Sequence, residues 1–141
     1  MRLLPVTLVL ALPLGLAGCG WLHAGGAPRN KPDGFVLRGY VTVAGAPAGA
    51  AGSPCQAPAS GVAVADEVRV TDPPAKLLGT GSLGAGVLAV DGTAYRCNFP
   101  FQVTAVPGGH KTYEITVGGR PAVSFPAADL RSDKPAVINV P

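Results

Sequence analysis

Charged and aromatic side chains are scarce in this chain. Of its 141 residues, 13% are charged and 6% are aromatic, and the formal net charge is only +3. Nucleic-acid binding needs a basic patch or stripe, so this balance provides no electrostatic footprint for a nucleic-acid partner. The short length also leaves no room for a two-domain enzyme.

Glycine, proline and apolar residues are abundant instead. The 20 Gly and 15 Pro together make about a quarter of the chain, a level at which disorder has to be considered. Hydrophobic residues make up 48% of the sequence, however, which is the opposite of the composition of a fully disordered chain. The composition therefore predicts one small globular domain with loose segments attached.

The first residues have the pattern of a secretory signal. One arginine precedes an apolar run over residues 3–16, which is 14 residues long. A helix needs about 20 apolar residues to cross a bilayer, whereas an apolar region of about 7 to 15 residues after a positive start is typical of a signal peptide. We therefore predict a signal peptide over residues 1–18, followed by a flexible tether over 19–33 and a folded domain over 34–141.

The run ends in Leu16-Ala17-Gly18-Cys19, which resembles the lipobox of bacterial lipoproteins. The resemblance implies that the Cys19 sulfur receives a diacylglycerol and that the signal peptide is cleaved just before this residue. An ordinary signal peptide that ends in an unmodified cysteine is the alternative. The resemblance implies a lipid-anchored protein on the extracytoplasmic face of the bacterial cell membrane, with the lipid bilayer as a partner.

The two other cysteines, Cys55 and Cys97, form an even pair once Cys19 is acylated. In an exported, oxidising setting the default expectation for such a pair is a disulfide. It would close a loop of 43 residues, for which the chain-entropy model gives a stabilisation of about 4 kcal/mol. A metal-binding or reactive thiol pair is the alternative, but the neighbouring residues offer it no further ligands.

Alternation of apolar and polar residues predicts a chain of short strands. Turn residues separate the segments, and the pairs at 91–92 and 118–119 favour two-residue hairpin loops. Residues 127–130 are predicted to form a single helical turn. The predicted strands are 35–43, 62–71 with a bulge near Asp66, 76–83, 87–90, 93–105 with a sheet edge or bulge at Pro100, 111–117, 120–125 and 136–140. This pattern predicts an all-β fold, a β-sandwich of seven or eight short strands, with a five-stranded barrel as the alternative.

Residues 44–61 interrupt the strands with a long segment of low complexity. Sixteen of its 18 residues are Ala, Gly, Pro or Ser, so we expect it to have no packing face. A loop of this length inside a compact domain is usually functional or disordered. The predicted disulfide would pin it to the domain through Cys55.

The strand order, with the run 101–106, a glycine turn and the run 113–117, is similar to that of prealbumin-like and carboxypeptidase-regulatory-like sandwiches. The Ala, Gly and Pro excess also resembles that of small secreted proteins and lipoproteins of actinobacteria that have no assigned activity. The resemblance covers most of residues 35–125 and implies a fold. It implies no function, because one fold supports many activities.

No residue pattern indicates a cofactor. Gly79, Gly81 and Gly84 match the spacing G-x-G-x-x-G of dinucleotide-binding sites, but that site requires a helix after the glycines. Residues 85–90 reach the next turn too soon for such a helix. These glycines are therefore predicted to serve bulges or close approaches of the backbone, and no cofactor is expected.

Catalytic and metal-binding patterns are equally weak. His110 lies in a glycine-rich turn, with Asp91 or Asp133 as conceivable partners, and Ser82 lacks the glycine two positions before it that a nucleophile elbow requires. Asp66 and Glu67 are neighbours on a predicted strand and would face opposite sides. The histidines and aspartates show no zinc or calcium ligand spacing, so no catalytic or metal-binding residue is assigned.

Exposed aromatic and arginine side chains are the candidates for a binding surface. Tyr95 and Tyr113 are predicted to point inward, which leaves Tyr40, Arg38 and Arg120 as exposed anchors. The lipid anchor, the flexible tether and the lack of a catalytic pattern lead us to expect a non-catalytic cell-envelope lipoprotein whose sandwich presents an edge or loop to another envelope component. The alternatives are a binding module for an envelope lipid or glycan and, last, a small hydrolase that uses His110.

The anchor can be tested directly with the variant Cys19→Ala. We expect this change to abolish incorporation of labelled fatty acid and to release the protein from membranes or block its maturation, because fourteen apolar residues cannot span a bilayer. Metabolic labelling and membrane fractionation measure both effects. Full membrane retention of the variant, together with an unlabelled wild type, would contradict the lipid anchor.

Overall fold

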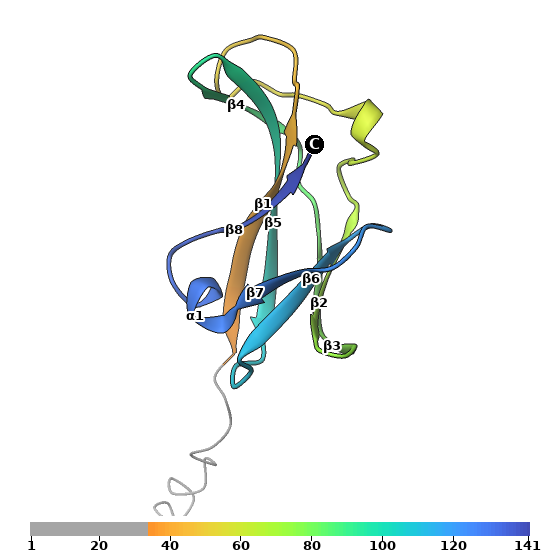
Figure 1. Ribbon diagram of the computed structural model, residues 1–141, viewed down its shortest axis with the longest axis vertical. Helices are drawn as coiled ribbons and strands as arrows, with labels where there is room; N and C mark the ends of the chain where they lie inside the picture. Colours follow the sequence, from red (N-terminus) through yellow and green to blue (C-terminus); the bar gives the residue numbers. More distant parts are fainter. Residues whose placement is uncertain (1–33) are drawn as a thin grey trace, which may run out of the picture. The chain divides into compact units, whose positions relative to one another are not determined.

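The computed structural model describes residues 34–141. The predicted signal peptide over 1–18, the tether over 19–33 and the lipidation of Cys19 lie outside the described residues. The described part folds into two four-stranded sheets that pack face to face (Figure 1). The prediction of a small all-β sandwich is confirmed.

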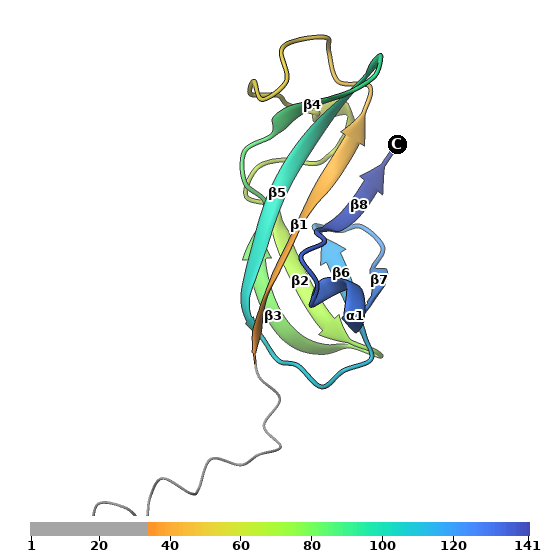
Figure 2. The same cartoon turned by 90° about the vertical axis from the view of Figure 1, so that its left-hand side faces the viewer.

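One sheet has the strand order β4-β5-β1-β8. Its strands are β1 (Phe35–Ala44), β4 (Val87–Asp91), β5 (Ala94–Val106) and β8 (Ala136–Val140). Strand β1 pairs antiparallel with β5 and parallel with β8, so this sheet is mixed. Strands β1 and β5 are the longest strands, and they pair with each other in the middle of this sheet (Figure 2).

The other sheet has the strand order β3-β2-β6-β7 and is antiparallel throughout. Its strands are β2 (Glu67–Asp72), β3 (Lys76–Ser82), β6 (Thr112–Val117) and β7 (Val123–Pro126). A short helix, α1 (Ala127–Leu130), follows β7, as predicted, and a single 3-10 turn, η1 (Pro58–Ser60), lies in the long loop.

The core lies between the sheets and is built by the predicted alternation. Tyr113, the largest fully buried side chain, donates a hydrogen bond from its hydroxyl to the carbonyl of Pro107 at 2.9 Å. The same buried cluster contains side chains from alternate positions of β1, β5 and β6, among them Leu37, Val41, Val43, Cys97, Phe99, Phe101, Val103, Ile115 and Val117. Burial of each such apolar side chain contributes about 1.5–3 kcal/mol.

The two sheets meet closely where β3 crosses β5, and glycines make this approach possible. A Cβ atom on Gly81 would lie 2.6 Å from the carbonyl oxygen of Gln102, and one on Gly79 would lie 2.9 Å from Cγ1 of Val103. Further along, the Gly84 N–H donates to the carbonyl of Pro100 at 2.6 Å. The interpretation of the G-x-G-x-x-G spacing as close backbone approaches is confirmed.

Pro100 lies at a local edge within an otherwise inner strand. Strand β4 pairs with β5 only as far as Val87 opposite Asn98, so it ends before it reaches Pro100. The missing N–H of proline therefore removes no hydrogen bond to β4, and Gly84 binds the carbonyl on that side. The predicted edge at Pro100 is thus the point at which β5 has no further pairing with β4, although β5 itself is an inner strand of the sheet.

The predicted strand over 62–71 begins five residues later than expected. Residues 63–66 form a turn, in which the Asp66 N–H donates to the Ala63 carbonyl at 3.2 Å and the Ala63 N–H donates to Oδ2 of Asp66 at 2.9 Å. A local bond between an aspartate and the backbone competes with strand pairing. As a result, Val64, which the alternation placed inward, is 60% exposed.

Both predicted two-residue hairpins need correction. The register pairs Asp91 with Ala94, so the loop is Gly92-Thr93, with a positive φ of 61° at Gly92. Gly118 and Gly119 do form the centre of a turn, in which the Arg120 N–H donates to the Val117 carbonyl at 3.2 Å, but pairing with β7 begins only at Ile115 opposite Val123, so the loop is longer than two residues. Strand β7 therefore starts at Val123, three residues after the predicted start.

The close approach at β3 predicts a matched pair of glycine variants. Gly81→Ala should lower the free energy of unfolding by about 1–3 kcal/mol, because its new Cβ meets the Gln102 backbone and the strands have to move apart. Gly119→Ala is the control, since no atom of the described residues lies within 4 Å of its added Cβ, and its effect should stay within about 0.5 kcal/mol. Urea unfolding measures both, and equal stabilities would contradict the close approach.

Candidate functional site

The long loop over residues 44–61 runs along the edge of β4. The Gly52 N–H donates to the carbonyl of Leu88, and the Leu88 N–H donates to the carbonyl of Ser53, both at 2.8 Å. These bonds extend the sheet beyond its last regular strand and cover groups that would otherwise be free to pair with another chain. The loop is therefore part of the sandwich.

A disulfide between Cys55 and Cys97 fixes the loop to the core, as predicted, with the two Cα atoms 5.8 Å apart. Cys97 is fully buried, and Ala46 and Ala57 of the loop pack against the same core. The expectation that this segment has no packing face is wrong. Small side chains conceal such a face in the sequence, because alanine carries no periodic signal in a stretch made of alanine, glycine and proline.

Gly86 sits directly against the disulfide. A Cβ atom on this residue would lie 2.5 Å from the Cys55 carbonyl oxygen and 2.7 Å from the Cys97 Sγ, while the Gly86 carbonyl accepts a hydrogen bond from the Cys55 N–H at 3.0 Å. The chain that links β3 to β4 is thereby held against the loop. These two segments form one wall and the base of a pocket.

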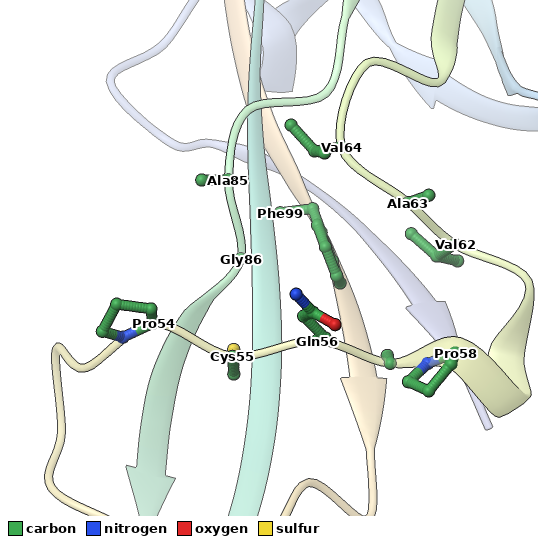
Figure 3. Close-up of a pocket in the computed structure, with 11 residues that line it drawn as sticks. Pro54, Cys55, Gln56, Pro58, Val62, Ala63, Val64, Ala85, Gly86 and Phe99 are labelled. Atoms are coloured by element: carbon green, nitrogen blue, oxygen red, sulfur yellow. The ribbon is translucent and has the colours of Figure 1, made fainter.

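The pocket has a volume of about 620 Å³ and opens between the loop and the sandwich. Figure 3 shows Ala85 and Gly86 on one side, Val62 and Val64 on the other, and the ring of Phe99 between them. The full lining is Pro54, Cys55, Gln56, Ala57, Pro58, Val62, Ala63, Val64, Ala85, Gly86 and Phe99. Apart from the two predicted disulfide cysteines, of which Cys55 belongs to this set, no residue of the lining carries a sequence pattern that predicts a site.

The chemistry of the lining is almost entirely apolar. Within residues 34–141, the lining includes no charged side chain, and the amide of Gln56 is its one polar side-chain group apart from the disulfide. Concave sites with apolar linings and a few polar groups are typical of ligand binding, and their usual volumes are about 300–1,000 Å³. This arrangement can take up apolar groups, and it holds no acid, base or nucleophile.

Arg120 ties the far end of the loop to the second sheet. Its guanidinium donates a hydrogen bond to the carbonyl of Ser60, at the end of η1, and the side chain is partly buried. The prediction that Arg120 is an exposed binding anchor is therefore wrong. Arg38 is exposed and Tyr40 is half-buried on the outward face of β1, and neither of them lines the pocket.

Three smaller hollows also lie along the same loop. Their volumes are about 260, 320 and 340 Å³, and each is lined by part of residues 44–61. The segment Gln56-Ala57-Pro58 separates the largest pocket from the hollow of 260 Å³ and contributes to both. The loop that the sequence marked as functional or disordered thus shapes the concave surface at this end of the domain.

His110 has a carboxylate partner, but a different one from those considered. Its Nδ1 lies 3.2 Å from Oδ2 of Asp72, and its ring lies edge-on to Tyr113 at 5.5 Å between centroids. Asp72 pairs with Lys76 at one end of the β2–β3 ladder, whereas Ser82 pairs with Glu67 at the other end. At about 3.3 Å per residue, this places Ser82 far from the imidazole.

The remaining candidates are surface or structural groups. Asp66 caps its turn, and the Oε1 of Glu67 lies 3.7 Å from the Nε of Arg69 at an exposed position. Tyr113 is buried as predicted, but Tyr95 is only half-buried. Across residues 34–141 no group of three His, Cys, Asp or Glu side chains is placed to hold a metal ion.

Comparisons with known proteins identified no relative of this chain. No family model and no curated protein matches the sequence, and no solved structure matches the fold. In the described part of the chain, no helix has the length and apolar character needed to cross a membrane.

The disulfide predicts a measurable loss of stability. The double variant Cys55→Ala, Cys97→Ala should lower the free energy of unfolding by about 2–5 kcal/mol, as removal of a native disulfide does in small domains. Chemical denaturation measures this change. Dithiothreitol should destabilise the wild type by a similar amount and leave the variant unaffected; a reductant effect on both proteins would show that it acts elsewhere.

Proposed function

We propose that this protein is a lipid-anchored binding domain of the bacterial cell envelope, without catalytic activity, and that it binds its partner in the pocket at loop 44–61. The observation that carries the proposal is the pocket of about 620 Å³, to whose lining residues 34–141 contribute no charged side chain. Water held against apolar walls is released when an apolar group enters, and this release favours binding.

The proposed location is supported by the sequence. The apolar run over residues 3–16 and the motif that ends in Cys19 resemble the signal of bacterial lipoproteins. The pairing of Cys55 with Cys97 is in keeping with export to an oxidising compartment. The lipid anchor makes the membrane bilayer the first partner in this proposal.

The lining favours an apolar ligand over a glycan. Sugars stack on exposed aromatic faces, but Tyr113 is buried, Tyr95 is half-buried, and the Phe99 ring at the pocket floor is 2% exposed. Within the lining, Gln56 is the one side chain with an amide to bind hydroxyl groups. A glycan-binding module is therefore the weaker candidate, while an apolar peptide or an acyl chain suits the walls.

The separation of His110 from Ser82 supports a binding role over hydrolysis. A serine nucleophile needs a base within about 3 Å, and the β2–β3 register places these two residues at different ends of the ladder. His110 and Asp72 also do not belong to the pocket lining. The proposed pocket therefore contains no group for acid–base chemistry.

The proposal can be tested with the full chain in nanodiscs and 1-anilinonaphthalene, an uncharged apolar probe. We expect the Val62 methyl signals in NMR spectra to shift saturably with added probe. Val64→Asp should weaken the apparent affinity at least about tenfold, equivalent to about 1.4 kcal/mol, because the bound probe would desolvate the new carboxylate. Val64 is 60% exposed, so this change should leave the fold intact.

Leu77→Asp is the matched control. Leu77 is an exposed apolar residue of β3, at 48% exposure, and it lies outside the pocket lining. This variant should bind the probe as the wild type does. Equal probe affinities for the Val64 and Leu77 variants would contradict the proposed pocket.

A further inference from the structure

The two long walls of the pocket come from a short β-ladder that opens. At the closed end, the Ala65 N–H donates to the carbonyl of Leu83 at 2.8 Å, and the Leu83 N–H donates to the carbonyl of Asp66 at 2.9 Å. Beyond this point the segments 62–64 and 84–86 separate, and the pocket lies between them (Figure 3). The walls are thus two stretches of chain that start as neighbours and then diverge.

Some backbone groups along these walls have no partner in the described part of the protein, although the N–H groups of Val62, Ala63 and Gly84 and the carbonyls of Ala63 and Gly86 are paired. Neither the N–H nor the carbonyl of Val64 forms a hydrogen bond with another residue of 34–141, and the same holds for Ala85. The backbone of Gln56, at the base of the pocket, is also without such a bond. In the empty pocket water can bind these groups, whereas a ligand that displaces the water must replace it.

This requirement distinguishes between an acyl chain and an apolar peptide, the two ligands that suit the lining. An acyl chain would cover the walls without offering a donor or an acceptor, and each backbone group left unpaired costs about 1–3 kcal/mol. An extended peptide carries both kinds of group at every residue and fills the space with its side chains. The exposed hydrogen-bonding groups therefore favour a peptide.

We infer that the pocket takes an extended, apolar peptide segment of a partner protein, which adds as a strand between residues 62–64 and 84–86. This inference rests on the proposed function and names the class of ligand. Main-chain bonds give affinity in strand addition, and pockets for alternate side chains give specificity.

The lining also defines the sequence that this segment needs. Successive side chains of a strand point to opposite faces, so alternate residues would face Phe99, where the small side chains of Ala63 and Ala85 leave room for a branched apolar side chain. In the part of the chain that the structure describes, no cationic side chain lines the pocket to bind a terminal carboxylate, and no anionic one lines it to bind a terminal amine. The segment is therefore internal, uncharged and rich in alternating apolar residues.

The test uses the full chain in nanodiscs with a defined probe. The probe is a heptapeptide of alternating valine and threonine, acetylated at one end and amidated at the other. We expect it to slow hydrogen exchange of the Val64 and Ala85 amides at least tenfold and to shift the Phe99 ring signals, as measured by NMR.

A matched peptide isolates the backbone contribution. Methylation of alternate backbone nitrogens keeps every side chain and removes donors, so the methylated heptapeptide should bind at least tenfold more weakly. The Val64→Asp variant should lose binding of the unmodified probe, whereas Leu77→Asp should retain it.

The outcomes separate this inference from the proposed function. Equal binding of the two heptapeptides, or dodecanoic acid shifting the Phe99 signals while neither peptide binds, would overturn strand addition and leave the pocket as a site for apolar ligands. Failure of the anilinonaphthalene probe at Val62 would overturn the proposed function itself. Slowed exchange at Val64 and Ala85 with the unmodified peptide alone would support both.

Discussion

The disulfide between Cys55 and Cys97 is the constraint on which this end of the domain depends. It joins a segment with almost no large side chains to Cys97, a fully buried residue of β5. Alanine, glycine and proline bury little apolar area, so the loop has little hydrophobic stabilisation of its own. With Cys55 fixed, the neighbouring backbone can pair with Gly86 and Leu88, and the loop lines the pocket.

Small residues also allow the two sheets to approach each other closely. Gly79 and Gly81 let β3 lie against Val103 and Gln102 of β5, and Leu83 then forms a bridge with Phe101. The sandwich is therefore closed along this side, immediately before the linker 84–86 turns away to line the pocket. Gly79 and Gly81 thus allow the close contact between β3 and β5, whereas the linker 84–86 that follows β3 leaves the space that forms the pocket.

The sequence indicated the strands well because period-two alternation reports directly on burial. It failed where a side chain changes the local backbone: Asp66 binds the Ala63 N–H and converts the expected start of a strand into a turn. It also could not find the partner of His110, because Asp72 is brought to it by the fold and not by spacing. The pocket was missed for a related reason, since uncharged, small residues such as Ala85 carry no chemical signature.

The place of β1 in the sheet has a consequence for the order of folding. This first strand lies between β5 and β8, so both of its neighbours come later in the chain, and β8 ends at Val140. Contacts between residues so distant in sequence form slowly, because a long loop must close before they contribute stability. The sheet with the order β4-β5-β1-β8 therefore cannot be completed until nearly the whole domain has been synthesised. Until β8 emerges, the edge of β1 that it covers has no partner strand and stays open to other chains.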